Sequence, residues 1–207
     1  MSDTSVVTPV GRLSYPHLFE RQPALNPGEE GKYGAAIIFA EGTDLSDVKT
    51  AIINAAKVKF GAEKAVDMIQ NGKLRLPLRE DGEEKGYPEN SVFFNARSKH
   101  QPSVVSRYKD PGTNNARVIT DAHELYPGCD VKFHITAYGY DVSGNKGVAL
   151  GLNHVLKYGE NDRLDGRRSA ESVFGSDITM PSETDLSALD TSSDTGEDPD
   201  MDLSAFM

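Results

Sequence analysis

The amino-acid sequence predicts a mainly β protein, an antiparallel β-barrel with one helical insertion, followed by an acidic C-terminal tail without folded structure. Short segments rich in β-branched and aromatic residues recur between residues 6 and 156, separated by Gly, Pro, Asn and Asp. Only residues 45–70 carry apolar residues at the three- and four-residue spacing of a helix. Strands and helices therefore do not alternate as they do in proteins with a parallel sheet.

The predicted strands follow from apolar, β-prone runs that end at turn-forming residues. We expect the Ser14-Tyr15-Pro16 sequence to end the first strand, and Asp141–Lys146 to form a hairpin turn between the last two. The acidic, Gly-containing run Arg79–Pro88 is expected to be a long exposed loop. In chain order, the predicted strands are Val6–Leu13, Tyr33–Phe39, Ser91–Arg97, Ser103–Tyr108, Val131–Tyr140 and Gly147–Leu156.

The helical insertion follows the second predicted strand. Its apolar residues predict a helix over Leu45–Phe60, with Thr43 or Asp44 as the N-cap and Gly61 as the stop. A shorter helix, Glu63–Gln70, is expected to end at Asn71-Gly72.

Charge is distributed unevenly along the chain, whose formal net charge is -10. All 22 Lys and Arg residues lie between Arg12 and Arg168, where their charge is balanced by acids. Residues 169–207 contain 10 of the 32 acidic residues and no base, and they are rich in Ser, Thr, Gly and Pro. Such a composition buries too little apolar surface to offset chain entropy. We therefore predict a folded domain over residues 1–168 and a disordered tail over 169–207.

Few residues point to catalysis, so we expect neither an enzyme nor a cofactor. Cys129, the only cysteine, stands in a Pro-Gly-Cys-Asp turn and is interpreted as a structural thiol. The five His residues are scattered without Cys partners, which disfavours a zinc site. The glycines of Gly139–Gly144 have P-loop spacing, but Asn145 occupies the position of the required Lys. The many carboxylates leave a metal-dependent nuclease open as an alternative.

The N-terminal residues lack the basic and apolar regions of a signal peptide, and no apolar run approaches the length of a membrane span. We therefore expect an intracellular protein that does not enter the membrane.

The Val131–Tyr140 strand has two different faces. Val131, Phe133, Ile135 and Ala137 alternate on an apolar face that we assign to the core. The opposite face presents flat rings for stacking on bases and polar or cationic groups for phosphates. Ordinary β-forming residues on a half-exposed sheet would give the same pattern. The nucleic-acid-binding candidates on this face are Lys132, His134, Tyr138 and Tyr140.

Residues 95–117 form a basic run, with five bases against the single acid Asp110. Because the acids and bases of residues 1–168 balance, this local excess favours binding of a polyanion, although a solvated loop can also be basic. Phe93 shares its strand face with Asn95 and is either a core residue or a stacking platform. The candidates in this region are Phe93, Arg97, Lys99, Arg107, Tyr108 and Lys109.

The C-terminal end combines acidic and apolar residues. Ten tethered negative charges can compete with a nucleic acid for a basic groove at an effective concentration of ~mM. The candidates for docking of partner proteins are Asp198, Asp200, Asp202 and Phe206.

Several blocks resemble a family of phage single-stranded-DNA-binding proteins that was formerly catalogued as a domain of unknown function. The resemblance covers most of residues 8–175. It is most specific in YGAAIIF (33–39), LPLREDGEEKG (76–86), YPGCDVKFHITAYGY (126–140) and GNKGVALGLNHVLKYGENDRLDGR (144–167). The tail is similar to the acidic, Phe-ending tails of bacterial and T7-like phage single-strand binders, except that Met207 follows Phe206.

The resemblance implies an OB-fold and sequence-nonspecific binding of single-stranded DNA in phage DNA replication or recombination. It implies a location in the cytoplasm of the infected bacterial host and docking of replication or recombination proteins on the tail. A protein-interaction scaffold whose tail is the working part remains an alternative, and so does a homodimer. The residues themselves do not distinguish DNA from RNA, because stacking and phosphate contacts serve both.

Overall fold

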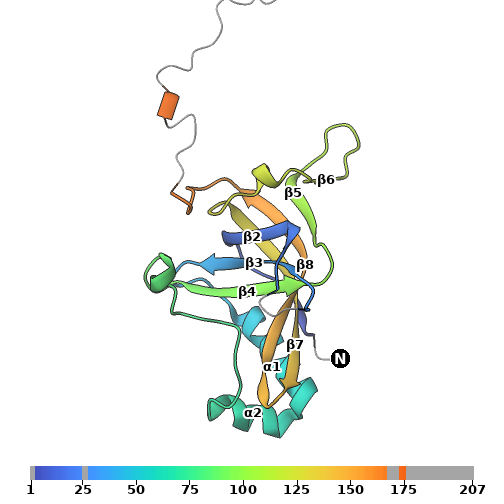
Figure 1. Ribbon diagram of the computed structural model, residues 1–207, viewed down its shortest axis with the longest axis vertical. Coiled ribbons are helices and arrows are strands. Elements are labelled where there is room, and N and C mark those ends of the chain that lie inside the picture. Colours follow the sequence, from blue (N-terminus) through green and yellow to red (C-terminus); the bar gives the residue numbers. More distant parts are fainter. Residues whose placement is uncertain (1–2, 25–27, 167–172, 176–207) are drawn as a thin grey trace, which may run out of the picture. The chain divides into compact units, whose positions relative to one another are not determined.

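The computed structural model describes residues 3–24, 28–166 and 173–175 of the chain. The chain divides into two units, Met1–Arg167 and Arg168–Met207. The predicted tail residues Asp198, Asp200, Asp202 and Phe206 lie outside the described residues. The first unit is mainly β with a helical insertion, as predicted (Figure 1). None of its helices, in the ranges described, is long and apolar enough to cross a membrane.

The described residues of the first unit form eight strands and two α-helices. The strands are β1 (Ser5–Val7), β2 (Gly11–Gln22), β3 (Lys32–Phe39), β4 (Val92–Ser98), β5 (Ser103–Lys109), β6 (Ala116–Val118), β7 (Asp130–Val142) and β8 (Asn145–Gly159). The helices are α1 (Ser46–Phe60) and α2 (Ala62–Gln70), with the short 3-10 helices η1 (Glu83–Lys85) and η2 (Ala122–Glu124). Both α-helices lie between β3 and β4, so the predicted insertion is confirmed.

Five of the strands close into a barrel. Their order is β7-β2-β3-β4-β8, and β8 pairs again with β7. Neighbouring strands are antiparallel except β4 and β8, which are parallel at Arg97 and Gly151. A closed five-stranded barrel in which the third and fifth strands are neighbours is the arrangement of an OB-fold. Outside this ring, β1 pairs with β7, and β5 and β6 continue the sheet beyond β8.

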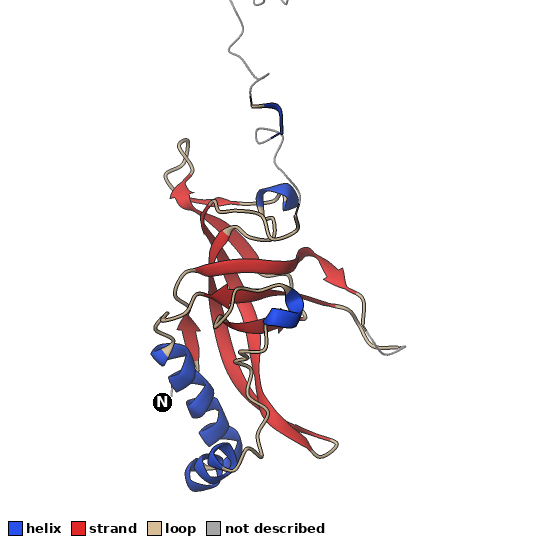
Figure 2. Ribbon diagram, turned by 90° about the vertical axis from the view of Figure 1, so that its left-hand side faces the viewer, coloured by secondary structure: helices blue, strands red, loops and turns tan. Residues whose placement is uncertain are grey.

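The core fills the barrel and extends under α1. The predicted core face of β7 is confirmed, since Val131, Phe133, Ile135 and Ala137 are at most 3% exposed. Figures 1 and 2 show α1 and α2 beside the long β7–β8 hairpin, where α1 packs on β7. Burial raises the pKa of the Cys129 thiol to about 12, so this thiol stays protonated at neutral pH and packs like an apolar side chain.

The first predicted strand is wrong at both of its ends. Residues 8–10 separate β1 from β2, and β2 continues past Pro16 to Gln22. Tyr15 has a φ of 44°, and the register of β2 against β3 shifts between Ser14 and His17. A bulge at this point accommodates a proline, which cannot donate a ladder hydrogen bond, without ending the strand.

Two smaller expectations also differ from the structure. Leu45, not Thr43 or Asp44, is the N-cap of α1, although Asp44 Oδ1 accepts a hydrogen bond from the Ser46 amide at 2.9 Å. The β7–β8 turn is tighter than predicted, because only Ser143 and Gly144 lie between the strands and both have positive φ. This is the geometry of a type I′ hairpin turn, which matches the twist of the strands.

Candidate nucleic-acid interface

The outer face of the β3–β4 pair has one covered end and one open end. Gly34 pairs with Arg97, Ala36 with Asn95, and Ile38 with Phe93. Alternation places all six residues outside the barrel, because the residues between them on both strands belong to the core. The predicted common face of Phe93, Asn95 and Arg97 is therefore confirmed.

The segment that follows α2 covers the Ile38–Phe93 end. Phe93 and Ile38 are buried with Tyr87, whose ring meets Phe93 edge-on at 5.1 Å between centroids. The Tyr87 hydroxyl donates to Ser14 Oγ at 3.0 Å. Arg79 and Lys85 lie over the Phe93 ring, 5.5 and 4.8 Å from its centroid. We call this end, with Ile38, Phe93 and Tyr87 as its centre, the covered end.

Phe93 is therefore a core residue, and its prediction as a stacking platform is wrong. The ring is 0% exposed, so a base has no free face to stack on. Strand alternation placed it correctly outside the barrel, but residues 79–88 bury it there.

At the other end the same face is open and basic. Three cavities adjoin here and all include Arg97, and the largest of them has a volume of about 430 Å³. We call this surface the Arg97 groove. The cations lining it are Lys32, Arg75, Arg79, Lys85, Arg97 and Lys99, and its tyrosines are Tyr15, Tyr33, Tyr138 and Tyr140. The two larger cavities have no Asp or Glu among the described residues that line them.

The central residues under the Arg97 groove are small, and Gly34 and Ala36 are buried there. A Cβ on Gly34 would lie 2.7 Å from the Ala96 carbonyl oxygen and 3.0 Å from Arg97 Cγ, so no side chain fits there. Ala36 and Asn95 complete the floor beside it. The solvent-exposed part of this floor is therefore Asn95, with the exposed Arg97 beside it.

One wall is a strap, residues 75–79, that spans the gap where β4 and β8 diverge. At its start the Arg75 amide donates to the Lys146 carbonyl at 3.0 Å and the Arg75 carbonyl accepts from Val148. At its end Arg79 exchanges two backbone hydrogen bonds with Phe93, at 2.9 and 2.8 Å. Leu76 remains 42% exposed on this wall. The strap lies at the start of the LPLREDGEEKG motif.

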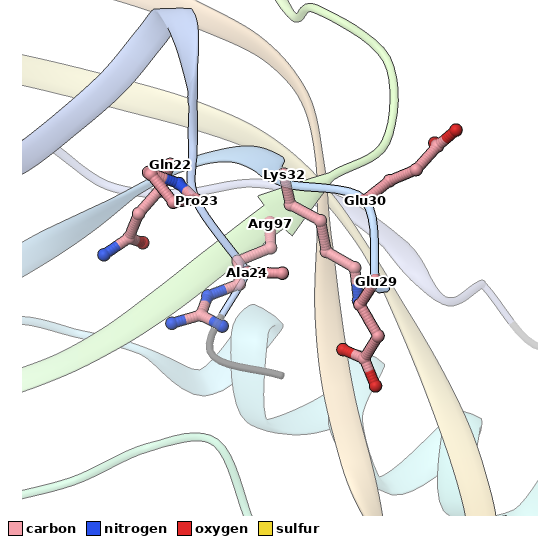
Figure 3. Close-up of a pocket in the computed structure, with 7 residues that line it drawn as sticks. All are labelled: Gln22, Pro23, Ala24, Glu29, Glu30, Lys32 and Arg97. Carbon is pink, nitrogen blue, oxygen red and sulfur yellow. The ribbon is translucent and has the colours of Figure 1, made fainter. Parts of the chain in front are cut away.

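The β2–β3 loop forms the rim of the Arg97 groove beside Lys32 and Arg97 (Figure 3). Figure 3 shows Lys32 and Arg97 together with Glu29 and Glu30 of the loop. The Arg21 guanidinium lies 5.5 Å from the centroid of the Tyr33 ring and donates to the Lys99 carbonyl at 3.2 Å. It also forms a 3.5 Å ion pair with Glu30, which places a carboxylate at the rim of an otherwise basic surface.

The predicted site residues are divided between two surfaces. Arg97, Lys99, Tyr138 and Tyr140 line the Arg97 groove, and Tyr138 is 50% exposed there. The remaining candidates, of which Lys132 and His134 are half-buried, lie away from it on β5 and β7. They are Arg107, Tyr108, Lys109, Lys132 and His134.

The sequence analysis missed six groove residues because they come from segments distant in the sequence. Arg75 and Arg79 lie on the strap, which was predicted as a loop without a partner. Tyr15 is directed outward by the β2 bulge, where its positive φ is the kind of backbone strain often found at functional sites. The only signal in the sequence was the placement of bases beside turn residues. The missed residues are Tyr15, Lys32, Tyr33, Arg75, Arg79 and Lys85.

Comparisons with known structures agree on the fold. The single-stranded-DNA-binding protein of bacteriophage Enc34, in complex with single-stranded DNA, matches with a TM-score of 0.54 and 20% identity over 78% of this chain and 89% of that chain. The same protein alone matches with a TM-score of 0.56 and 18% identity, over 83% and 90% of the two chains. Bacteriophage T7 gp2.5, a single-stranded DNA binding protein, matches with a TM-score of 0.55 and 13% identity, over 82% and 99%.

No curated protein sequence matches the chain. A family model does, and it describes the ssDNA-binding protein of Enterobacter phage Enc34. The match covers residues 4–186, which is most of the chain and includes the strap and the β2–β3 loop. The chain therefore belongs to the family of the Enterobacter phage Enc34 ssDNA-binding protein.

Proposed function

We propose that the chain binds single-stranded DNA in the Arg97 groove without strong sequence preference. The observation that carries this proposal is the gathering of six cations and four tyrosines around the Arg97 groove, drawn from β2, β3, β4, the β4–β5 loop, β7, the strap and η1. Family membership supports the same ligand. The groove also occupies the face between the second and third barrel strands and the loop between the first and second, where OB-folds bind oligonucleotides.

The proposed roles follow from the chemistry of the side chains. Arg75, Arg97 and Lys99 neutralise phosphates, and each contact releases counterions from the strand. Tyr138 and Tyr140 stack on bases, which every base permits because every base has an aromatic face. Neither interaction reads base edges, so the resulting specificity is for single strands and not for a sequence.

A comparison of labelled oligonucleotides tests this proposal. Single-stranded DNA should bind more tightly than duplex DNA of the same length, and single-stranded RNA of that length measures whether the sugar is discriminated. The double substitution Arg75→Gln/Arg97→Gln should weaken binding to every sequence. The matched control Lys49→Gln/Lys64→Gln removes the same charge from the exposed surface of α1 and α2. Equal losses in the two double variants would mean that net charge, and not the groove, determines affinity.

The proposed activity is binding and not catalysis, in keeping with the family and the similar structures. Labelled single-stranded DNA should stay intact in the presence of protein and Mg²⁺. Loss of the label that depends on the metal would instead support the nuclease alternative.

We further propose that residues 1–168 form the DNA-binding domain and that residues 169–207 compete with DNA and dock partner proteins. This role suits a protein of DNA replication or recombination in the cytoplasm of an infected host. The 10 acids and the absence of bases in residues 169–207 support it. Ending the chain at Arg168 should increase affinity, most strongly at low salt where charges are least screened. Phe206→Ala keeps every charge, so it should leave DNA affinity unchanged while abolishing partner docking.

A further inference from the structure

A second cationic and aromatic cluster lies outside the Arg97 groove, on the outer face shared by β5, β7 and β8. The Arg107 guanidinium lies between two rings, 4.7 Å from the centroid of Tyr158 and 5.2 Å from that of Tyr108. Its Nη1 donates to the Tyr158 carbonyl at 3.2 Å, and the Lys132 ammonium lies 5.4 Å from the Tyr158 centroid. We call Arg107, Tyr108, Lys132 and Tyr158 the Tyr158 cluster.

Both rings of the Tyr158 cluster are accessible. Tyr158 is 37% exposed and Tyr108 is 67% exposed. Cations ordered on tyrosine rings, with part of each ring free, resemble the combination that binds single strands in general.

The outer face of the β7–β8 hairpin connects the Tyr158 cluster to the Arg97 groove. Paired residues share a face, so Tyr138 lies beside Ala149, Thr136 beside Gly151, and His134 beside His154. Gly151 is also the residue that pairs with Arg97, which places the start of this path at the groove. The outward residues of the path are Tyr138, Thr136, His134 and Lys132 on β7, and Ala149, Gly151, His154, Leu156 and Tyr158 on β8.

The chemistry of this path suits a polyanion. None of its outward residues is Asp or Glu, although the chain has 32 acids. The His134 and His154 rings are stacked with 5.3 Å between centroids and 4° between planes. His134 Nε2 shares a 2.8 Å hydrogen bond with Ser5 Oγ, which orients that ring. The path therefore has no carboxylate between Tyr138 and Lys132, and it ends beside Asp130, whose Oδ1 accepts a hydrogen bond from Asn161.

We propose that a single strand longer than the Arg97 groove continues over the β7–β8 hairpin and binds the Tyr158 cluster as a second subsite. This inference rests on the proposed function of the groove. Tyr138 and Lys132 are six residues apart, or ~20 Å at ~3.4 Å per residue of strand. A stacked strand of about six nucleotides spans that distance, at ~3.4 Å per nucleotide.

The absence of Trp from the chain permits a direct test, because one introduced Trp is the only such fluorophore. Tyr138→Trp reports on the groove and Tyr158→Trp on the second subsite. Oligo-dT of about three nucleotides, at ~3.4 Å per nucleotide, is too short to span from Tyr138 to Lys132. It should quench Tyr158→Trp only at a concentration about tenfold or more higher than the one that quenches Tyr138→Trp. Oligo-dT of about 20 nucleotides should quench both at the same concentration, because the tethered strand has a high effective concentration at the second subsite.

The outcomes distinguish the two proposals. If the long oligonucleotide quenches only Tyr138→Trp, the second subsite is refuted and the groove stands. If it quenches only Tyr158→Trp, the groove is refuted. If neither responds, both fail. If the short oligonucleotide quenches both at one concentration, the two surfaces are independent sites and the continuous path is wrong.

Charge substitutions provide a second measurement. Arg107→Gln/Lys132→Gln should weaken binding of the long oligonucleotide by about fivefold or more and leave the short one unchanged. The control Lys49→Gln/Lys64→Gln removes equal charge from the helices and should affect neither length selectively. An equal loss for both lengths in the Arg107→Gln/Lys132→Gln variant would overturn the proposal.

Discussion

The two ends of the β3–β4 pair have the same alternating pattern and different surroundings. At the covered end, Ile38 and Phe93 are buried with Tyr87, and Arg79 and Lys85 lie over the Phe93 ring. At the Arg97 groove, Gly34 and Arg97 occupy equivalent outward positions four paired rows away, and there Gly34 is buried but Arg97 is exposed. The comparison teaches that strand alternation decides which residues leave the barrel, whereas the segment laid over the sheet decides which of them meet solvent.

The largest expected effect is at the covered end. Phe93→Ala should lower the free energy of unfolding by about 3–5 kcal/mol, because it leaves a cavity between Ile38 and Tyr87. Urea denaturation measures this loss. If Phe93→Ala were as stable as the wild type and lost DNA affinity instead, the ring would contact DNA and the two ends would not differ as described.

The opposite behaviour is expected in the groove. Tyr138→Ala should weaken single-strand binding by about 1–3 kcal/mol through loss of one stacked base. Its free energy of unfolding should change little, because the side chain is half exposed. Fluorescence anisotropy with labelled oligo-dT measures the affinity. Val142→Ala is the control on the same hairpin, since Val142 is 64% exposed and does not line the groove.

A substitution at Ser14, which is hydrogen-bonded to Tyr87 of the covered end, should have a smaller effect on stability and none on DNA affinity. Ser14→Ala removes the acceptor of the Tyr87 hydroxyl and should reduce the free energy of unfolding by about 1 kcal/mol. DNA affinity should be unchanged, because neither residue lines the groove. A clear loss of affinity with normal stability would show that the cover also shapes the groove.

The smallest expected change is in the salt dependence of binding. Arg97→Gln should reduce the log–log slope of affinity against salt concentration by about 0.7, the value for one phosphate contact with a single strand. Arg117→Gln removes the same charge from a residue already paired with Glu124 and should leave the slope unchanged. Identical slopes in the two variants would place the phosphate contacts elsewhere.

Much of the fold could be predicted from local patterns, because alternation and helical spacing act within one element. The β7 core face, the position of the helical insertion and the β7–β8 hairpin all follow from residues near one another in the chain. The end of the first strand could not be predicted in this way. Pro16 normally signals a break, and only the Tyr15 bulge and the pairing with β3 allow β2 to continue.

The candidate site was only partly predictable. Arg97, Lys99, Tyr138 and Tyr140 were found from alternation and local charge, and they do line one groove. Arg107, Tyr108, Lys109, Lys132 and His134 carry the same signals yet lie on a different surface. Local charge and strand alternation predict which side chains share one face of a strand. They do not predict which strand faces are adjacent in the folded protein.

The sequence by itself determined the β-rich barrel, the concentration of net negative charge in residues 169–207 and which residues of β7 enter the core. These properties depend on composition and on a period of two along a strand. Only the tertiary structure decided that Phe93 is buried, that Arg75 joins Arg97, and that β4 and β8 are neighbours. Phe93 is buried by Tyr87, and Arg75 is held by a strap whose backbone hydrogen bonds link Arg75 to Lys146 and Arg79 to Phe93. The partners at its two ends are far apart in the chain, and no local pattern specifies them.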